Sequence, residues 1–228
     1  MGAGSTETVS TETMIPTAGV RLPADLTTPA MAEGTVLFAH GSGSSRHSPR
    51  NVAVAEKLNQ NALGTVLVDL LTPEEELLDE QTAELRFDIG LLSDRLVGIV
   101  DWLRSGQEMA PLPIGLFGAS TGAAAALVAA AARPDDVPAV VSRGGRPDLA
   151  GPDLPEVRAA TLLLVGGWDE QVLELNERAC EALGGVAELH VVPGATHLFE
   201  EPGKLEQVAD EAAGWFAEHL PPGPPSRR

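Results

Sequence analysis

The sequence predicts one α/β domain, in which a mostly parallel sheet is covered by helices on both faces. Three observations lead to this fold class. Short apolar runs alternate with longer helical patterns, the apolar runs are apolar throughout, and 228 residues suit a single core. We place the domain at residues 13–220, between an N-terminal tail (1–12) and a proline-rich C-terminal tail (221–228).

The expected elements follow in chain order. Alternating polar and apolar residues in 13–22 are compatible with one or two lead-in strands. The buried strands are expected at 34–40, 65–71, 113–119, 139–142, 161–166 and 187–192. The helices are expected at 48–63, 86–104, 120–133, 170–183 and 204–220. In sheets of this kind, ligands bind beyond the carboxyl ends of the strands, so the candidate site is sought there.

Composition and charge exclude several classes of function. The net charge of −18 disfavours nucleic acid and anionic membranes as partners, and 4% aromatic residues without tyrosine offer no stacking platform. No apolar run approaches the roughly 18 residues of a membrane span, and the N-terminus lacks a secretory signal pattern, so we expect a cytoplasmic protein. A single cysteine, Cys180, excludes an internal disulfide and a multi-cysteine metal site, and we expect no metal.

The strongest motif is Gly118-Ala-Ser120-Thr-Gly122, which has the pattern G-x-S-x-G. It lies directly between the strand expected at 113–119 and an alanine-rich helix, which is the context that a nucleophile elbow requires. The small flanking residues allow a tight turn that lifts the serine above the sheet. The helix that starts there points its N–H groups at the site and favours negative charge. We therefore expect Ser120 to be a nucleophile.

A serine nucleophile needs a positioned base and an acid, which follow it in this chain order. Asp169 comes directly after the strand expected at 161–166, and His197 comes directly after the last strand. Glu170 is the competing acid, but Asp169 comes first after the strand and is preferred. His190 and His219 fit less well, because the first lies within a strand and the second on the last helix.

The oxyanion hole requires two backbone N–H donors. One is expected from Thr121, the residue after the nucleophile. The other is expected from the loop that follows the first buried strand, where Ser42 is preferred and Gly43 is second. Gly41 and Gly43 make this loop small enough to approach a substrate, and His40 is expected to order it. The loop lacks the Gly-Lys-Ser/Thr ending of a phosphate loop, so a nucleotide site is disfavoured.

With these residues the chain resembles the α/β-hydrolase superfamily and, within it, the dienelactone hydrolase-like family. The resemblance extends over about residues 20–220. Its most specific segments are 38–45 (Phe-Ala-His-Gly-Ser-Gly-Ser-Ser), 117–124 (Phe-Gly-Ala-Ser-Thr-Gly-Ala-Ala), 165–172 (Val-Gly-Gly-Trp-Asp-Glu-Gln-Val) and 193–199 (Pro-Gly-Ala-Thr-His-Leu-Phe). The resemblance implies a sheet of about seven or eight mainly parallel strands and hydrolysis of esters or lactones without a cofactor. Relatives with these motifs resemble stand-alone hydrolases or domains attached to a phosphoribosyltransferase.

One residue departs from the family pattern. Dienelactone hydrolases proper use a cysteine nucleophile, whereas this elbow carries Ser120, and Cys180 lies in the middle of a predicted helix. The sequence therefore predicts a serine esterase that acts on a small-molecule ester or lactone, as a monomer or homodimer. Thioester or amide hydrolysis would use the same residues. A non-catalytic binding protein on this scaffold is the alternative from another class.

The surroundings of the site suggest a small substrate. Only about eighteen residues separate the strands expected at 139–142 and 161–166, which is too few for a lid domain, so we expect an open site. Residues 72–86, rich in glutamate and leucine, form either a small flap or, as we prefer, a solvated acidic helix.

Two arginines suggest an anionic substrate. Arg143 and Arg146 follow a strand end, and either could offer a fork of donors to a carboxylate or phosphate. The slightly favoured alternative is that they pair with Asp69, Asp88 or Asp148 and only hold loops in place.

Overall fold

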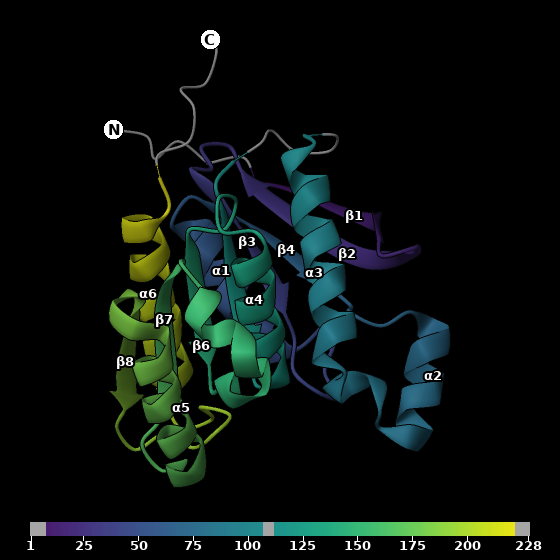
Figure 1. Cartoon of the computed structure of the whole chain (residues 1–228). Coiled ribbons are helices and arrows are strands. Elements are labelled where there is room, and N and C mark those ends of the chain that lie inside the picture. Colours follow the sequence, from purple (N-terminus) through teal and green to yellow (C-terminus); the bar gives the residue numbers. More distant parts are fainter. Residues whose placement is uncertain (1–7, 107–111, 222–228) are drawn as a thin grey trace, which may run out of the picture.

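A twisted sheet of eight strands forms the centre of the computed structural model, which describes residues 8–106 and 112–221 (Figure 1). The spatial order of the strands is β1-β2-β4-β3-β5-β6-β7-β8. β1 and β2 are antiparallel to their neighbours, and the strands from β4 to β8 pair in parallel. The strands are β1 (Thr8–Thr17), β2 (Val20–Pro29), β3 (Gly34–Ala39), β4 (Leu63–Val68), β5 (Ile114–Ala119), β6 (Ala139–Arg143), β7 (Ala160–Gly166) and β8 (Ala187–Val192). The predicted mostly parallel α/β sheet is confirmed.

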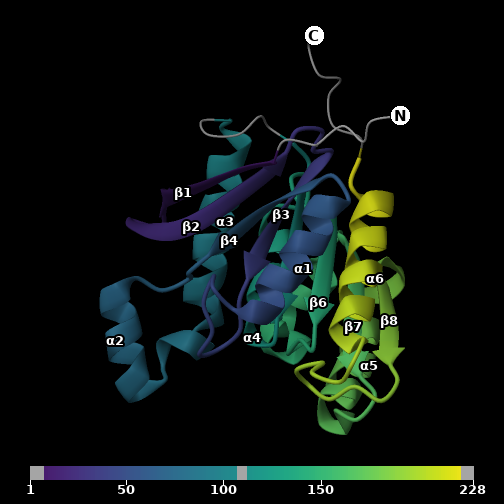
Figure 2. The same ribbon diagram turned by 180° about the vertical axis from the view of Figure 1, so that it is seen from behind.

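Helices cover both faces of the sheet. They are α1 (Pro49–Gln60), α2 (Pro73–Thr82), α3 (Ile89–Arg104), α4 (Thr121–Ala132), α5 (Glu170–Leu183) and α6 (Lys204–His219), with short 3₁₀ segments at Leu85–Phe87, Pro147–Glu156 and Gly184–Val186. α3, α4 and α5 lie over one face (Figure 1), and α1 and α6 lie over the other (Figure 2). None of the helices in the described residues combines the length and the apolar character that a membrane span requires.

The apolar strands fill two cores, one on each face of the sheet. In β3, Leu37 packs under α3 and α4, whereas Val36 and Phe38 pack on the opposite side under α1 and α6. The rings of Phe38 and Phe117 lie 4.8 Å apart between centroids. Because both faces are covered, these strands are apolar at every position, and their carboxyl ends meet at one rim of the sheet.

The N-terminal hairpin differs from the expected boundaries. β1 begins at Thr8, inside the segment expected to be a tail, and it pairs with β2 from Thr8↔Pro29 to Thr17↔Val20. The first half of β1 is exposed, so its serines and threonines resemble a tail in the sequence, and only the pairing reveals a strand. Residues 1–7 and the C-terminal tail beyond residue 221 lie outside the described residues.

Two elements end earlier than expected: α1, because the chain reverses into β4 at the amino ends of the strands, and β4, because the chain there turns toward the candidate site. α1 begins at Pro49 after Ser48, as predicted, but it ends at Gln60, and Ala62 adopts a positive φ of 58°. β4 ends at Val68 instead of residue 71. Beyond it, Asp69 and the amide of Leu70 bond to the loop after β3.

Candidate active site

Ser120 lies in a strained turn between β5 and α4. Its φ of 50° and ψ of −122° are unusual for a residue with a side chain, a conformation that costs about 1–3 kcal/mol. A Cβ on Gly118 would lie 2.4 Å from the Cα of Ala123, and a Cβ on Gly122 would lie 2.3 Å from the carbonyl oxygen of Ala39. Both glycines are therefore required by close backbone approach, and the turn has the geometry of a nucleophile elbow.

Backbone bonds hold this turn against the end of β6. The amide of Ser120 donates to the carbonyl oxygen of Arg143 at 3.2 Å, and the amide of Arg146 donates to the carbonyl oxygen of Ser120 at 3.0 Å. Thr121 is the first residue of α4, so its N–H has no acceptor in a preceding helical turn. That N–H is one of the two donors expected for an oxyanion.

The predicted acid and histidine lie together at the same rim. Nδ1 of His197 is 2.6 Å from Oδ2 of Asp169, which is the N-cap residue of α5. Glu170, the competing acid, is exposed in the first turn of α5. The His197 ring packs over Gly144, where a Cβ would lie 3.4 Å from both Cε1 and Nδ1. Gly144 directly follows Arg143, to which the Ser120 amide is bonded, so the ring lies beside the turn.

Ser120 and His197 line one hollow of about 230 Å³, which we call the catalytic hollow. Its walls are formed by Gly41, Ser42, Ser44, Ser48, Arg50, Ala119, Ser120, Arg143, His197 and Leu198. A hydrogen bond between Ser120 Oγ and the His197 ring is not among the contacts of the described residues. In enzymes without substrate such bonds are often long and tighten only in the complex, so the shared hollow is the relevant observation.

The loop after β3 approaches the serine closely but differs from expectation at Ser42. A Cβ on Gly41 would lie 3.1 Å from the Cβ of Ser120. The Ser42 amide, expected to be open for an oxyanion, instead donates to Oγ1 of Thr121 at 2.9 Å. The hydroxyl at Thr121 explains this difference, because it offers an acceptor where a smaller residue would leave the amide free.

His40 holds this loop as a neutral ring. Its Nε2 accepts from the amide of Leu70 at 3.0 Å, which leaves Nδ1 protonated to donate to the carbonyl oxygen of Gly41, also at 3.0 Å. Burial lowers the pKa of His40, although the charges of Asp69 and Glu76 partly oppose that effect. A neutral ring suits both bonds, because a protonated ring could not accept from Leu70.

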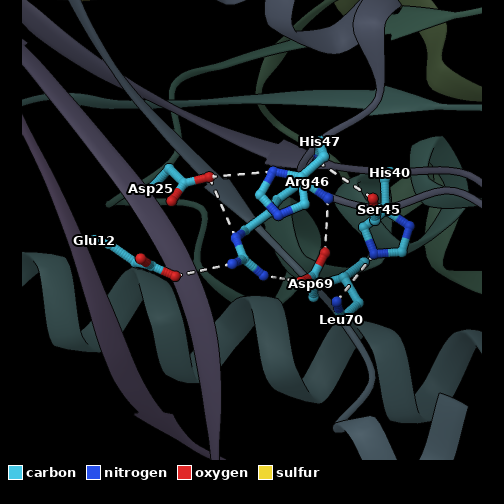
Figure 3. Close-up of polar contacts among 8 residues, drawn as sticks. All are labelled: Glu12, Asp25, His40, Ser45, Arg46, His47, Asp69 and Leu70. Atoms are coloured by element: carbon cyan, nitrogen blue, oxygen red, sulfur yellow. Dashed lines mark hydrogen bonds and ion pairs between the residues drawn. The ribbon is translucent and has the colours of Figure 1, made fainter.

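Arg46 ties the same loop to three strands (Figure 3). Its amide and guanidinium both bond to Asp69 beyond β4, the amide at 2.7 Å. The guanidinium also contacts Glu12 on β1 at 2.9 Å and Asp25 on β2 at 3.2 Å. Burial by itself lowers the pKa of Arg46, but its bonds to Asp69 and the charges of Asp25 and Glu12 raise it overall. The sequence offered no signal for this network, which depends on the hairpin.

We expect Arg46→Met to lower the free energy of unfolding by about 2 kcal/mol, because it leaves the largely buried Asp69 carboxylate without its partner. The same change should lower kcat/KM by loosening the loop. Urea unfolding and initial rates measure both effects. Arg178→Met is the matched control, because Arg178 pairs with Glu174 on the exposed side of α5 and should cost less than about 0.5 kcal/mol. Equal losses in the two variants would contradict the anchoring role.

The loop after β3 (residues 40–45) is called the oxyanion loop after its expected role. A second hollow lies on its other side. This acidic hollow, of about 270 Å³, is lined by Thr121 and the loop on one side and by Glu76, Asp79 and Glu80 of α2 on the other. α2 begins with a capping box between Thr72 and Glu75, and it projects from the body (Figures 1 and 2). The acidic segment at residues 72–86 thus contains the helix α2, which has an exposed outer side and also forms one wall of a hollow.

Ion pairs hold α2 to the domain. Oδ2 of the buried Asp79 is 2.5 Å from Nε of Arg86, and Oε1 of Glu75 is 2.5 Å from NH2 of the buried Arg95. Burial alone raises the pKa of Asp79 and of Glu75. The bonds to Arg86 and Arg95, respectively, outweigh this effect and lower both pKa values. These carboxylates therefore remain charged, and their ion pairs hold α2 in place as one wall of the acidic hollow.

The two arginines singled out in the sequence have different surroundings. Arg146 bonds with both guanidinium nitrogens to Asp148, at 2.8 and 2.7 Å, as the loop-holding alternative expects. Arg143 instead lines the catalytic hollow and lies over the Phe117 ring at 5.9 Å from its centroid. Arg50 joins it there from the first turn of α1. Arg50 follows the glycine-containing loop in the sequence but was not among the predicted site residues.

Comparison with solved structures places this geometry in a family. A dienelactone hydrolase from Anabaena variabilis has 55% sequence identity to the chain and a TM-score of 0.92, with 94% of this chain and 99% of that one covered. The chain belongs to the dienelactone hydrolase-like family of α/β-hydrolases. A Xanthomonas campestris α/β serine hydrolase described as lacking a lid has the same fold, at a TM-score of 0.74 and 23% identity over 94% and 97% of the two chains. No protein-family model matches the chain.

Two curated Mycobacterium tuberculosis proteins also match this dienelactone hydrolase-like chain. Each is 60% identical to it over 200 residues, which cover 87% of this chain. Both carry the provisional name phosphoribosyl transferase. The match covers 44% of their length, so the chain spans less than half of these relatives.

Proposed function

We propose that the protein is a serine hydrolase that cleaves small carboxylic esters or lactones through an acyl-enzyme. The observation that carries this proposal is the 2.6 Å contact between His197 and Asp169, made by a ring that lines the same hollow as Ser120. A carboxylate on Nδ1 holds the proton there and leaves Nε2 free to accept the proton of Ser120. Three groups from distant parts of the chain then act as a triad.

In the first half-reaction, Oγ of Ser120 attacks the carbonyl carbon while His197 takes its proton. Asp169 stabilises the imidazolium that forms. The oxyanion accepts hydrogen bonds from the N–H groups of Thr121 and Ser42. The Thr121 hydroxyl holds the Ser42 amide in place beforehand, and the developing oxyanion, a stronger acceptor, replaces it.

The first half-reaction ends when the ester bond breaks and His197 gives its proton to the leaving alcohol, which leaves the acyl-enzyme. In the second half-reaction, water attacks the acyl-enzyme with His197 again as the base, and His197 returns the proton to Oγ of Ser120 as the acid is released. With a lactone, the freed alcohol remains part of the acyl group, and the product is a single hydroxy acid. The catalytic and acidic hollows, of about 230 and 270 Å³, favour small groups on either side of the scissile bond. Gly41 lines both hollows and Gly43 the acidic one, so their backbone would contact the substrate.

The triad geometry also separates the alternatives. Thioesters and amides would follow the same route and differ only in the leaving group. A binding protein has no need of an aligned carboxylate and imidazole beside a strained serine. We assign hydrolysis instead of the phosphoribosyl transfer in the name of the longer relatives, because the nucleophile elbow and the His197–Asp169 pair support attack by a serine.

A fluorophosphonate probe tests this assignment directly. We expect it to label the folded protein at Ser120, as located by peptide mapping, because only an activated serine reacts readily. Ser120→Ala should not be labelled, and Ser105→Ala, which changes an exposed serine at the end of α3, should be labelled as the parent is. Parallel assays with p-nitrophenyl esters of graded length and with simple lactones define the substrate. Absence of labelling would refute a serine hydrolase, and labelling at another serine would refute Ser120 as its nucleophile.

A further inference from the structure

Arg143 is a buried arginine that has no carboxylate partner among the described residues. Arg46, Arg86, Arg95, Arg133 and Arg146 each bond to an aspartate or glutamate. Arg143 is only 7% exposed, and its NH1 is buried without a hydrogen-bond partner in the described structure. A buried cation without a partner is expensive to maintain, which indicates a group that binds there from outside.

A second cation faces the same space. Arg50 lines the catalytic hollow together with Arg143, and its buried Nε also lacks a partner within the described chain. Its NH1 reaches Glu200 at 3.3 Å, but that carboxylate is 65% exposed and lies outside the hollow lining. Burial and, after it, the charge of Arg50 lower the pKa of Arg143 to about 10. The two guanidinium groups thus repel each other across a hollow whose described lining includes no carboxylate.

The remaining walls of the catalytic hollow supply neutral donors. The hydroxyls of Ser44 and Ser48 line it, and Ser48 is the N-cap of α1, a helix of 12 residues. Pro49 has no N–H, and the Ser48 side chain accepts from the amide of Asn51, so the helix start offers the Arg50 amide and the positive end of its dipole. All these groups favour negative charge at this end of the hollow.

We propose that Arg143 and Arg50 form an anion subsite that binds a phosphate group of the substrate, close to the ester that Ser120 attacks. The inference rests on the proposed function for the ester, but the binding of the anion does not. A phosphate dianion offers a negative charge to each of the two guanidinium groups, the buried one of Arg143 and the partly exposed one of Arg50, whereas a carboxylate carries only one. Its several oxygens can also accept from guanidinium groups and serine hydroxyls at different angles.

The acidic hollow determines which end of the substrate lies where. Glu76 and Glu80 line it, and both are exposed side chains of α2. Like charges would repel a phosphate from that side. The phosphate therefore lies on the Arg143 side, and the uncharged end of the substrate occupies the acidic hollow beyond Thr121. Because the catalytic hollow is only about 230 Å³, the phosphate and the scissile carbonyl are separated by few atoms.

The subsite is tested by comparing inorganic phosphate with acetate as inhibitors of neutral-ester hydrolysis. The ionic strength is held constant, and the pH is about 8, where phosphate is mostly dianionic. We expect competitive inhibition by phosphate, about tenfold or more tighter than by acetate. Arg143→Gln and Arg50→Gln should each weaken it about tenfold, and Arg178→Gln, an exposed single-charge control, should leave it unchanged. Equal inhibition by acetate overturns the preference for phosphate, and unchanged inhibition in both hollow variants overturns the subsite.

Calorimetry separates the subsite from the catalytic assignment. Phosphate should bind the Ser120→Ala protein, and Arg143→Met introduced into it should abolish that binding while raising Tm in phosphate-free buffer, because a buried unpaired charge is removed. If phosphate binds but the parent cleaves no ester, the proposed function fails and the subsite stands. If esters are cleaved but phosphate does not bind, the subsite fails and the proposed function stands. A lower Tm in Arg143→Met would indicate a structural role for Arg143 and would also overturn the subsite.

Discussion

Replacing Ser120 with alanine is expected to lower kcat for ester hydrolysis by at least about 10⁴-fold. The reason is chemical, because the variant lacks the hydroxyl that is proposed to form the acyl bond and to give its proton to His197. What remains would be water attack assisted by the oxyanion donors, which in other triad enzymes leaves a residual rate. Initial rates with a p-nitrophenyl ester, corrected for spontaneous hydrolysis, measure the effect.

The serine variant is also a test of strain. A φ of 50° is no easier for alanine than for serine, so unfolding by urea should show a similar stability in the two proteins. Loss of activity without loss of stability would then be assigned to chemistry. Ser105→Ala serves as the control for a serine outside the site. Retention of more than a hundredth of the parental kcat, free of contaminating esterase, would show that Ser120 is not the nucleophile.

Asp169→Asn is expected to have the second largest effect, a fall in kcat of about 10⁴-fold with the fold intact. An asparagine amide of the same shape can donate to Nδ1 of His197, which would stabilise the tautomer with its proton on Nε2. That nitrogen could then no longer accept the proton of Ser120. The imidazolium of the transition state would also lose its neighbouring negative charge.

Glu170→Gln is the matched comparison, because it removes one carboxylate at the adjacent position. Glu170 is exposed and has no contact with His197, so the change should alter kcat by less than about threefold. Steady-state rates of the two variants across a range of pH distinguish the acids. Equal losses, or a larger loss in Glu170→Gln, would show that the wrong carboxylate has been assigned.

Much of the nucleophile turn could be predicted from local sequence. Gly118 and Gly122 are needed because their Cα atoms touch neighbouring backbone, and the strand before and helix after them follow from apolar patterns. The pairing of Asp169 with His197 could also be predicted, for a related reason. Parallel strands end at one rim, so two residues that directly follow β7 and β8 must lie near each other.

The oxyanion loop shows where such reasoning stops. Ser42 was selected from its position after His40 and Gly41, but the fate of its amide depends on a hydroxyl 79 positions away, on Thr121. Strand β1 is a similar case, since Thr8 to Glu12 are polar apart from Val9 and become a strand only by pairing with β2. Neither contact leaves a trace in local composition or periodicity.

Apolar patterns and the steric demands of neighbouring residues were therefore sufficient to predict the α/β architecture, the turn at Ser120 and the contact between Asp169 and His197. The partners of the charged side chains, in contrast, could be identified only from the tertiary structure. Arg143 and Arg146 are three positions apart and look equivalent in the sequence, yet Arg146 has Asp148 two residues away, whereas Arg143 is carried by β6 under the catalytic hollow toward Arg50. The electrostatic interaction of a guanidinium group extends over several ångströms. Its partners are therefore the groups that folding brings near it, and these come from distant segments of the chain.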